Sequence, residues 1–424
     1  MGLSMAERKA VTRHLARRYD RAPKKEKGRI LTELCELTGW TRRHARRALT
    51  EALRPSERRP ARPRRRRYGR EVLEPLIRIW AILNGPAGKR LAPFLPEIVE
   101  VLERCGELEL SPEVRAKLVG ISAATIDRLL APQRRALKVK GRSGTKPGTL
   151  LKRQIPIRTF AEWTETAPGF CEVDLVAHEG SDPSGDFCQT LTLTCVNTGW
   201  TEVRAVPNKA QRWVFEALRD IRASLPFPLL GLDSDNGGEF INNELYRYCV
   251  AEHITFTRSR SYRKNDNCFV EQKNWPVVRQ EVGYLRYDTP EELAVLRELY
   301  SHLRLYVNFF QPQMKLVQKT RQGARVSKRF DRAATPYRRV LASPDVADEA
   351  KDALTEAYRA LNPVALKRAI GRCQDLLLEV NRTKPSHRKE VKQSPDHPFR
   401  RAFSPRELSR TFPVRQPREL SRTS

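Results

Sequence analysis

The sequence predicts a multidomain protein with three kinds of region. These are a helical N-terminal region, an α/β core built on a five-stranded mixed sheet, and a mostly helical C-terminal region. Apolar residues recur at helical spacing through the first third of the chain, and strand-like runs replace them from about residue 161. Helical spacing returns after about residue 290. With 424 residues, the chain is long enough for several domains that each bury a core.

The charge balance of the chain implies a polyanionic partner. The sequence carries 80 Lys and Arg residues against 50 Asp and Glu residues, a formal net charge of +30. This excess goes beyond what solubility requires, and double-stranded DNA is the simplest polyanion to match it. A membrane surface is the competing partner, but no stretch approaches the roughly 20 apolar residues of a spanning helix. We therefore expect a cytoplasmic, nucleoid-associated protein that binds DNA and no membrane.

The eight cysteines argue against two other classes of protein. They are scattered singly, and no pair has the Cys-x-x-Cys spacing of a zinc ribbon. Nor do they form the dense framework of a small disulfide-bonded domain. Most lie in apolar runs, so we expect buried free thiols.

Residues 1–53 predict a DNA-binding helix-turn-helix. Apolar residues recur at helical spacing over 27–37, Gly39 lies in a turn, and Thr41 suits the N-cap of a second helix. In that helix the arginines lie off the apolar face, near the end that a recognition helix offers to the major groove. The predicted DNA contacts are Arg42, Arg43, Arg46 and Arg47. A helical hairpin with solvated basic side chains is the alternative interpretation.

Residues 54–70 predict an extended, Arg-rich linker. The segment holds nine Arg, three Pro and one Glu among its 17 residues, so it cannot form a core. Its side chains are expected to follow phosphates or to lie in a minor groove, and an unspecific solvated linker is the alternative. The predicted contacts are Arg64, Arg65, Arg66 and Arg67.

Residues 71–133 predict a second helical unit. Within it, residues 111–132 repeat the helix-turn-helix pattern, with Gly120 in the turn and Ser122 as the cap. A second DNA-binding unit and a purely structural bundle are both open interpretations. Residues 134–160 are basic and contain several Gly and Pro, so they predict a linker.

Residues 161–310 predict the α/β core domain. Strand-like and helical runs follow one another in the order βββαβαβα, with turn clusters between them. This order predicts three antiparallel strands and two more added by right-handed crossovers, as in a ribonuclease-H-like fold. The predicted strands are 169–179, 187–197, 201–207, 228–235 and 254–259, and the predicted helices are 209–225, 239–253 and 265–278.

Three acids fall where such a fold would bring them together. Asp174 lies midway along the first strand, Asp235 lies at the end of the fourth, and Glu271 lies in the first turns of the last helix. The C-terminal ends of strands in α/β sheets are where ligands usually bind. Asp233 is a rival to Asp235, and the Asn-Gly that follows Asp235 favours Asp235.

Acids in this arrangement predict a site for two divalent metal ions. Mg²⁺ prefers hard oxygen ligands and binds through a few carboxylates together with substrate phosphate. Two ions about 3.5–4 Å apart can hold the attacking and the leaving oxygen of an in-line displacement. Because acids packed together repel one another, at least one is expected to have a raised pKa in the absence of metal. The sequence therefore predicts phosphodiester chemistry.

The motifs around these acids resemble a known family. Residues 234–240 are SDNGGEF, residues 265–274 are NDNCFVEQKN, and 35 residues separate Asp235 from Glu271. This pattern is similar to the DDE catalytic core of retroviral integrases, and more closely to that of bacterial insertion-sequence transposases. The resemblance covers about residues 165–315, and the predicted helix-turn-helix units also look like those of such transposases.

The resemblance implies an enzyme, a DDE transposase or integrase that acts as a Mg²⁺-dependent polynucleotidyl transferase. Asp174 would bridge two Mg²⁺ ions, while Asp235 and Glu271 would each hold one, and Mn²⁺ would substitute for Mg²⁺. The partners would be double-stranded element ends and target DNA. Because the reaction makes two cuts at two ends, a homo-oligomer on DNA is expected.

Residues near the acids are further candidates for DNA contact. A basic loop precedes Glu271, and two asparagines lie on the Glu271 face of the helix by i−4 and i+3 spacing. A solvated charge run is the alternative for the loop. The predicted contacts are Arg258, Arg260, Arg263, Lys264, Asn267, Lys273 and Asn274. Pro276 is expected to kink or shorten this helix.

The last part of the chain, residues 311–424, supports fewer predictions about structure and function. Residues 311–381 are basic at first and helical afterwards, and 315–342 are expected to form an irregular extension that contacts DNA. Residues 382–424 carry many Arg and Pro and contain PRELSRT twice, so they predict a disordered tail.

Three functions fit these observations. The first is a transposase that binds element ends, cleaves 3′ ends and transfers strands. The second is a DNA-binding regulator with an inert nuclease-like core, and the third is a metal-dependent endonuclease that does not join. The intact acidic triad favours an enzyme over a regulator. It does not separate cutting from joining, because water and a 3′-hydroxyl would use the same ions.

Overall fold

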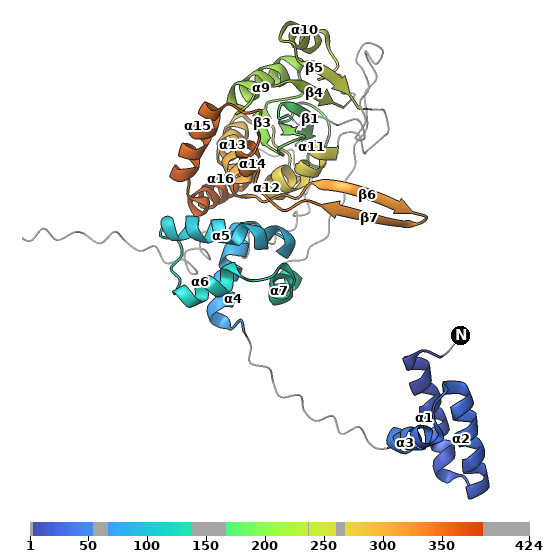
Figure 1. The fold of residues 1–424 in the computed structure, drawn as a ribbon. Helices are drawn as coiled ribbons and strands as arrows, with labels where there is room; N and C mark the ends of the chain where they lie inside the picture. Colours follow the sequence, from blue (N-terminus) through green and yellow to red (C-terminus); the bar gives the residue numbers. More distant parts are fainter. Residues whose placement is uncertain (1–2, 54–66, 137–166, 236, 260–267, 385–424) are drawn as a thin grey trace, which may run out of the picture. The chain divides into compact units, whose positions relative to one another are not determined.

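The computed structural model describes residues 3–53, 67–136, 167–235, 237–259 and 268–384. They belong to two compact units, Met1–Arg67 and Tyr68–Ser424 (Figure 1). Most of the two predicted linkers and nearly all of the predicted tail lie outside the described residues. The finer domain boundaries stay predictions.

The N-terminal unit is a small helical bundle. Its described helices are α1 (Met5–Arg21), α2 (Lys24–Thr38) and α3 (Arg42–Leu53). Their apolar faces meet in one core, which includes Leu15, Ile30, Leu34, Ala45 and Leu49. Gly39 ends α2 with a φ of 71°, and the Thr41 hydroxyl accepts a hydrogen bond from the His44 amide at 3.4 Å. The predicted turn and cap between α2 and α3 are therefore confirmed.

The second unit opens with a group of helices. They are α4 (Arg70–Ile82), α5 (Gly88–Arg104), α6 (Pro112–Val119), α7 (Ala123–Leu129) and α8 (Ala131–Ala136). The Ser122 hydroxyl caps α7 by accepting from the Thr125 amide at 3.3 Å, as predicted. Buried residues of α4 and α5 belong to the same hydrophobic cluster as the central sheet. The Tyr306 hydroxyl also donates to the carbonyl of Ile82 at 2.5 Å. These helices therefore pack as part of the core unit.

A five-stranded mixed sheet lies at the centre of this unit. The strands are β1 (Phe170–Ala177), β2 (Gln189–Cys195), β3 (Thr201–Val206), β4 (Gly231–Ser234) and β5 (Thr255–Arg258). Their order is β3-β2-β1-β4-β5. Strand β2 pairs antiparallel with both β1 and β3, and β4 and β5 run parallel to β1. This arrangement confirms the predicted ribonuclease-H-like sheet.

Helices connect and cover the strands. The connecting helices are α9 (Gln211–Ser224), α10 (Asn243–Ala251), α11 (Cys268–Lys273), the π-helix η2 (Asn274–Arg279), α12 (Gln280–Val282) and α13 (Pro290–Phe310). Pro276 does end the regular α-helix early, as predicted, but the helical path continues through η2. Proline lacks an amide hydrogen and clashes with the carbonyl four residues earlier, and the wider turn of a π-helix avoids that contact.

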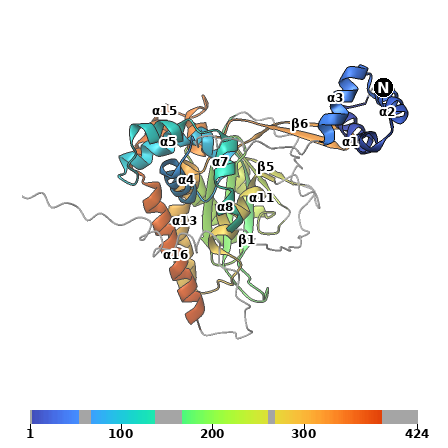
Figure 2. The ribbon, with the colours of Figure 1, turned by 90° about the horizontal axis from the view of Figure 1, so that it is seen from below.

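The C-terminal part adds a hairpin and more helices. Strands β6 (Leu316–Gln322) and β7 (Arg325–Phe330) form the hairpin, and α14 (Pro336–Leu341), α15 (Asp348–Ala360) and α16 (Pro363–Thr383) follow it. The prediction of an irregular extension is wrong for residues 316–330, which form a regular two-stranded sheet. Helix α16 lies along α13 (Figure 2). Among the described residues, no helix is both long enough and apolar enough to cross a membrane.

Candidate active site

One face of the sheet carries a group of acids. Side chains alternate along a strand, so Glu172 and Asp174 of β1 point to the same face. Glu172 lies beside Asp233 in the parallel register of β1 and β4. Asp235 follows two residues after Asp233, just beyond the end of β4. Two neighbouring strands therefore bring these carboxylates together, and we call this surface the acidic face.

Asp174 is half-buried and held by neutral donors. Its carboxylate accepts hydrogen bonds from the amide of Leu175 at 2.9 Å and from the side-chain amide of Asn274 at 2.6 Å. Burial, with the negative charges of Asp235 and Glu271, raises the pKa of Asp174 to about 7. The pKa of one acid is therefore raised as expected, but burial contributes more to this rise than the crowding of the acids.

Asp235 and Asp233 have different surroundings. Asp235 lies past the strand end, where its carboxylate accepts from the amide of Gly237 at 2.8 Å, and burial raises its pKa. Asp233 is fully buried in the strand and accepts a hydrogen bond from the Thr257 hydroxyl. Asp235 is therefore the one of the two that lies at the open end of the sheet. The pKa of Glu239 is also raised, first by burial and then by the charge of Asp235.

Glu271 reaches the acidic face from α11. Its side chain is exposed, and its charge contributes to the raised pKa of Asp174. The start of α11 is fixed by Glu172, which is fully buried and accepts from the amide of Val270 at 2.9 Å. Glu172 was not among the predicted site residues. Its signal in the sequence was an acid inside an apolar strand, two residues before Asp174 and so on the same face.

The donor set suits a hard divalent cation. Asp174, Asp235 and Glu271 offer carboxylate oxygens, which are the ligands that Mg²⁺ prefers. The Asn274 side-chain oxygen is buried and has no hydrogen-bond partner among the described residues, so one more oxygen lies beside Asp174. The three carboxylates do not all lie within 4.8 Å of one another.

The predicted recognition arginines lie at the start of α3, and all four are exposed. Arg42 folds back on α2, where it donates to the carbonyl of Gly28 at 3.1 Å and to the Thr32 hydroxyl at 2.9 Å. Arg47 pairs with Glu51 at 2.6 Å. Within the described part of this unit, the side chains of Arg43 and Arg46 make no ion pair with an acid, and they are the better candidates for DNA contact.

The other predicted DNA contacts are in varied positions. Arg67 is exposed, whereas Arg258 is the last residue of β5 and is buried. Lys273 is half-buried, and burial lowers its pKa to about 7. Asn274 contacts Asp174 instead of facing solvent. The remaining predicted contacts lie outside the described residues, and they are Arg64, Arg65, Arg66, Arg260, Arg263, Lys264 and Asn267.

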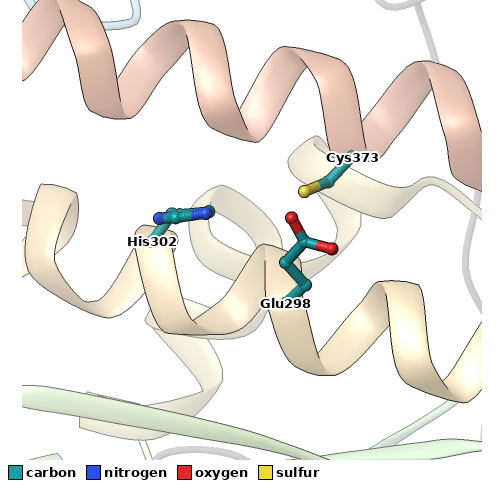
Figure 3. Close-up of side chains that lie close together, drawn as sticks. All are labelled: Glu298, His302 and Cys373. Carbon is teal, nitrogen blue, oxygen red and sulfur yellow. The ribbon is translucent and has the colours of Figure 1, made fainter.

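A second group of potential metal ligands lies between α13 and α16. The ligand atoms of Glu298, His302 and Cys373 all lie within 4.8 Å of one another (Figure 3). Burial and the hydrogen-bonded Glu298 carboxylate raise the pKa of the Cys373 thiol to about 11. Without a bound metal the sulfur therefore keeps its proton near neutral pH, and the three side chains form a polar contact between two helices.

Comparisons with known proteins give a sequence relative and several structures. No protein-family model matches the chain. The uncharacterized protein y4rM of Sinorhizobium fredii (strain NBRC 101917 / NGR234) is 43% identical over 339 residues, which are 80% of this chain and 96% of that protein. The catalytic core domain of BIV integrase matches 41% of this chain and 93% of its own, at 16% identity and a TM-score of 0.28.

The catalytic core domain of HTLV-2 integrase in complex with magnesium matches 34% of this chain and 90% of its own. Its identity to this chain is 16% and its TM-score is 0.27. The strand order of the sheet, and not these low scores, establishes the fold.

Proposed function

This chain belongs to the family of the Sinorhizobium fredii protein y4rM, and we propose that it is a DNA transposase of the integrase type. It binds the ends of a mobile element, cleaves their 3′ ends and joins them to target DNA by strand transfer. The observation that supports this proposal is the acidic face, where the charges of Asp235, at the end of β4, and Glu271, on α11, both act on Asp174 of β1.

The acids act as ligands for divalent metal in this proposal. Bound Mg²⁺ ions supply Lewis-acid stabilisation of the charge that develops on the attacking and leaving oxygens. Asp174, Asp235 and Glu271 would hold the ions, and the charges of Asp235 and Glu271 both act on Asp174. Asn274 orients the Asp174 carboxylate through its 2.6 Å hydrogen bond. Glu172 fixes the start of α11 and so the position of Glu271.

The N-terminal unit recognises the element ends in this proposal. Its α2 and α3 have the spacing of a helix-turn-helix, and Arg43 and Arg46 are exposed at the start of α3. The net charge of +30 supports a large electrostatic contribution to DNA binding. Two ends must be cut and joined together, so the active form is a homo-oligomer on DNA.

A strand-transfer assay tests the proposal. Duplex DNA from either side of the gene serves as the donor, a plasmid serves as the target, and Mg²⁺ or Mn²⁺ is supplied. The wild type is expected to shorten the 3′ ends and to join them to the plasmid. Asp235→Asn is expected to do neither while still binding the donor. Asp352→Asn, which changes an exposed acid on α15, is the matched control and should behave as the wild type.

Two alternatives give different results in the same assay. A regulator with an inert core would bind the donor but show no metal-dependent cleavage, and Asp235→Asn would then equal the wild type. An endonuclease without joining would nick DNA in an Asp235-dependent manner and yield no joined product. Either result would rule out the proposed transposase.

A further inference from the structure

The β6–β7 hairpin is exposed on both of its sides. We call residues Leu316–Phe330 the arm. Apart from Leu316 at its base, every residue of its two strands is exposed. The arm extends away from the helices of its unit in two perpendicular views (Figures 1 and 2). An isolated two-stranded sheet is marginally stable in water, so we expect a binding partner to stabilise the arm.

The composition of the arm identifies the charge of that partner. Between residues 316 and 330 the chain has basic residues and no acid. The basic residues are Lys319, Arg321, Arg325, Lys328 and Arg329. Lys319 lies directly opposite Lys328 in the antiparallel register. Like charges placed opposite each other destabilise a sheet, and a polyanion between or along them would remove that cost.

Both faces of the arm carry these charges. Side chains alternate, so Lys319, Arg321 and Lys328 share one face, while Arg325 and Arg329 lie on the other. Val317, Val326 and Phe330 are exposed apolar side chains of the arm, but Lys328 separates Val326 from Phe330, so the apolar surface is not continuous. A protein partner would need to supply acids on both sides, whereas a DNA groove presents phosphates along both of its edges.

The base of the arm is firmly attached to its own unit. Lys315 and Asp331 bond to each other across the base, with the Lys315 amide donating to the Asp331 carboxylate at 2.6 Å. Arg339 of α14 pairs with Asp331 at 2.7 Å. The Lys315 ammonium also donates to the carbonyl of Asn197, in the turn between β2 and β3. The arm is therefore an exposed ribbon on a fixed base, which preserves its direction when a partner binds.

We propose that the arm is a DNA-binding element that lies along a groove of duplex DNA and contacts backbone phosphates. A two-stranded ribbon has the width to enter the major groove, and Lys and Arg are the side chains that neutralise phosphates. The inference deepens the proposed function, on which it rests, because it assigns a second DNA contact to the unit that carries the acidic face. It adds a surface beyond the helix-turn-helix of the N-terminal unit.

Equilibrium binding by the full-length chain tests this inference. Fluorescence anisotropy measures the affinity for a labelled duplex at several salt concentrations. The variant carries Lys319→Gln, Arg321→Gln and Lys328→Gln, which are exposed and lie on one face. Removing each phosphate-binding side chain should reduce the slope of log K against log salt by about 1, so the slope should fall by about 3. The variant should also bind the duplex more weakly at low salt.

A charge-matched variant controls for net charge. Arg359→Gln, Arg372→Gln and Arg382→Gln remove the same charge from exposed positions on α15 and α16. This variant should keep the wild-type slope. Thermal unfolding of all three proteins checks that the arm substitutions leave the fold intact, which the full exposure of the arm predicts.

Different results separate the arm from the proposed function. An unchanged salt slope in the arm variant would overturn the arm proposal, even if the wild type joins DNA ends. If the arm variant instead loses self-association in the absence of DNA and keeps its DNA affinity, the arm is a protein interface and the proposal fails. If the slope falls by about 3 but the wild type never joins DNA, the arm proposal stands and the transposase proposal fails.

Discussion

Two groups of buried carboxylates in the same unit are stabilised in opposite ways. Glu202 on β3 is fully buried, and Arg304 binds both of its oxygens, at 2.6 and 2.8 Å. Glu292 on α13 is also fully buried and pairs with Lys384 at 3.0 Å. On the acidic face, the hydrogen bonds to Asp174 and Asp235 come instead from backbone amides and an asparagine.

This difference distinguishes structural acids from acids kept for a ligand. The chain has 80 basic residues, so counter-ions are available wherever packing favours them. Structural carboxylates such as Glu202 have arginines that offset the cost of burial. Burial and the charges of the neighbouring acids raise the pKa of Asp174, although the hydrogen bonds from Asn274 and Leu175 act in the opposite direction. On the described part of the acidic face, neutral donors bond to Asp174 and Asp235. A bound cation would add the positive charge that these donors lack.

The largest effect should follow from removing one acid of the acidic face. Asp174→Asn takes away a metal ligand, and the several kcal/mol of transition-state stabilisation from metal correspond to a loss on the order of 10³-fold in strand transfer. Single-turnover assays with Mg²⁺ measure the rate, and circular dichroism checks the fold. Residual activity within tenfold of the wild type would contradict the assignment.

For the free energy of unfolding, a structural acid should matter more than an acid of the acidic face. Glu202→Gln leaves Arg304 without its charged partner and should cost about 3–5 kcal/mol of unfolding free energy. Asp174→Asn should be neutral or stabilising without metal, because it removes a repelled buried charge. Urea unfolding of both variants in EDTA compares them. Equal destabilisation by the two substitutions would erase the distinction between the groups.

Asn274 should have an intermediate effect on the reaction. Asn274→Ala removes the 2.6 Å hydrogen bond to Asp174, and loss of such a supporting contact at a metal ligand typically costs about 10–100-fold in affinity or activity. The apparent Mg²⁺ requirement of strand transfer should rise in the variant. Asn274→Gln serves as the comparison, because it keeps the amide but displaces it. A wild-type Mg²⁺ dependence in Asn274→Ala would argue against an orienting role.

The pH dependence of stability should report Asp174 directly. Its pKa is about 7 in the folded protein against an ordinary value of 3.8. Between these values the folded state retains a proton that the unfolded chain has released, so stability without metal should fall as pH rises through this window. Urea midpoints from about pH 4 to pH 8 measure the slope. Asp174→Asn or added Mg²⁺ should reduce the slope without abolishing it, because the pKa values of Asp235 and Glu239 are also raised. An unchanged slope in the variant would assign the effect elsewhere.

The smallest effect should come from the contact between α13 and α16. Cys373→Ser keeps a polar group near Glu298 and should change the unfolding free energy by about 1 kcal/mol or less. If this group is only a polar contact, Zn²⁺ should shift the melting temperature of wild type and variant equally. A Zn²⁺-specific stabilisation of the wild type alone would make this group a metal site.

Much of the core fold could be predicted from local patterns. Alternating runs located all five strands, and their order along the chain led to the observed sheet. The positions of Asp174 and Asp235 followed from those strands. Glu172 was missed because an acid inside an apolar strand carries no motif, and its role depends on a contact with Val270, 98 positions away.

The two strands of the arm were missed for a different physical reason, although residues 315–342 were expected to contact DNA. A strand is usually detected by apolar residues on alternate positions, and most residues of this hairpin are polar on both faces. Lys319 and Lys328 even oppose pairing. Two of the predicted DNA contacts near the site have other surroundings in the structure. Arg258 is buried and Asn274 contacts Asp174, and both outcomes depend on packing that the local sequence does not show.

The π-helical segment η2 changes the phase of the helix that carries Glu271. In an unbroken α-helix, Val278 would lie seven residues on and share the open side of Glu271. Val278 is instead fully buried, as is Val277, while Trp275 remains exposed. The wider turn thus lets one continuous helix present an acid at its start and an apolar anchor at its end. Removing one residue between them would turn the valines toward solvent or the acid toward the core.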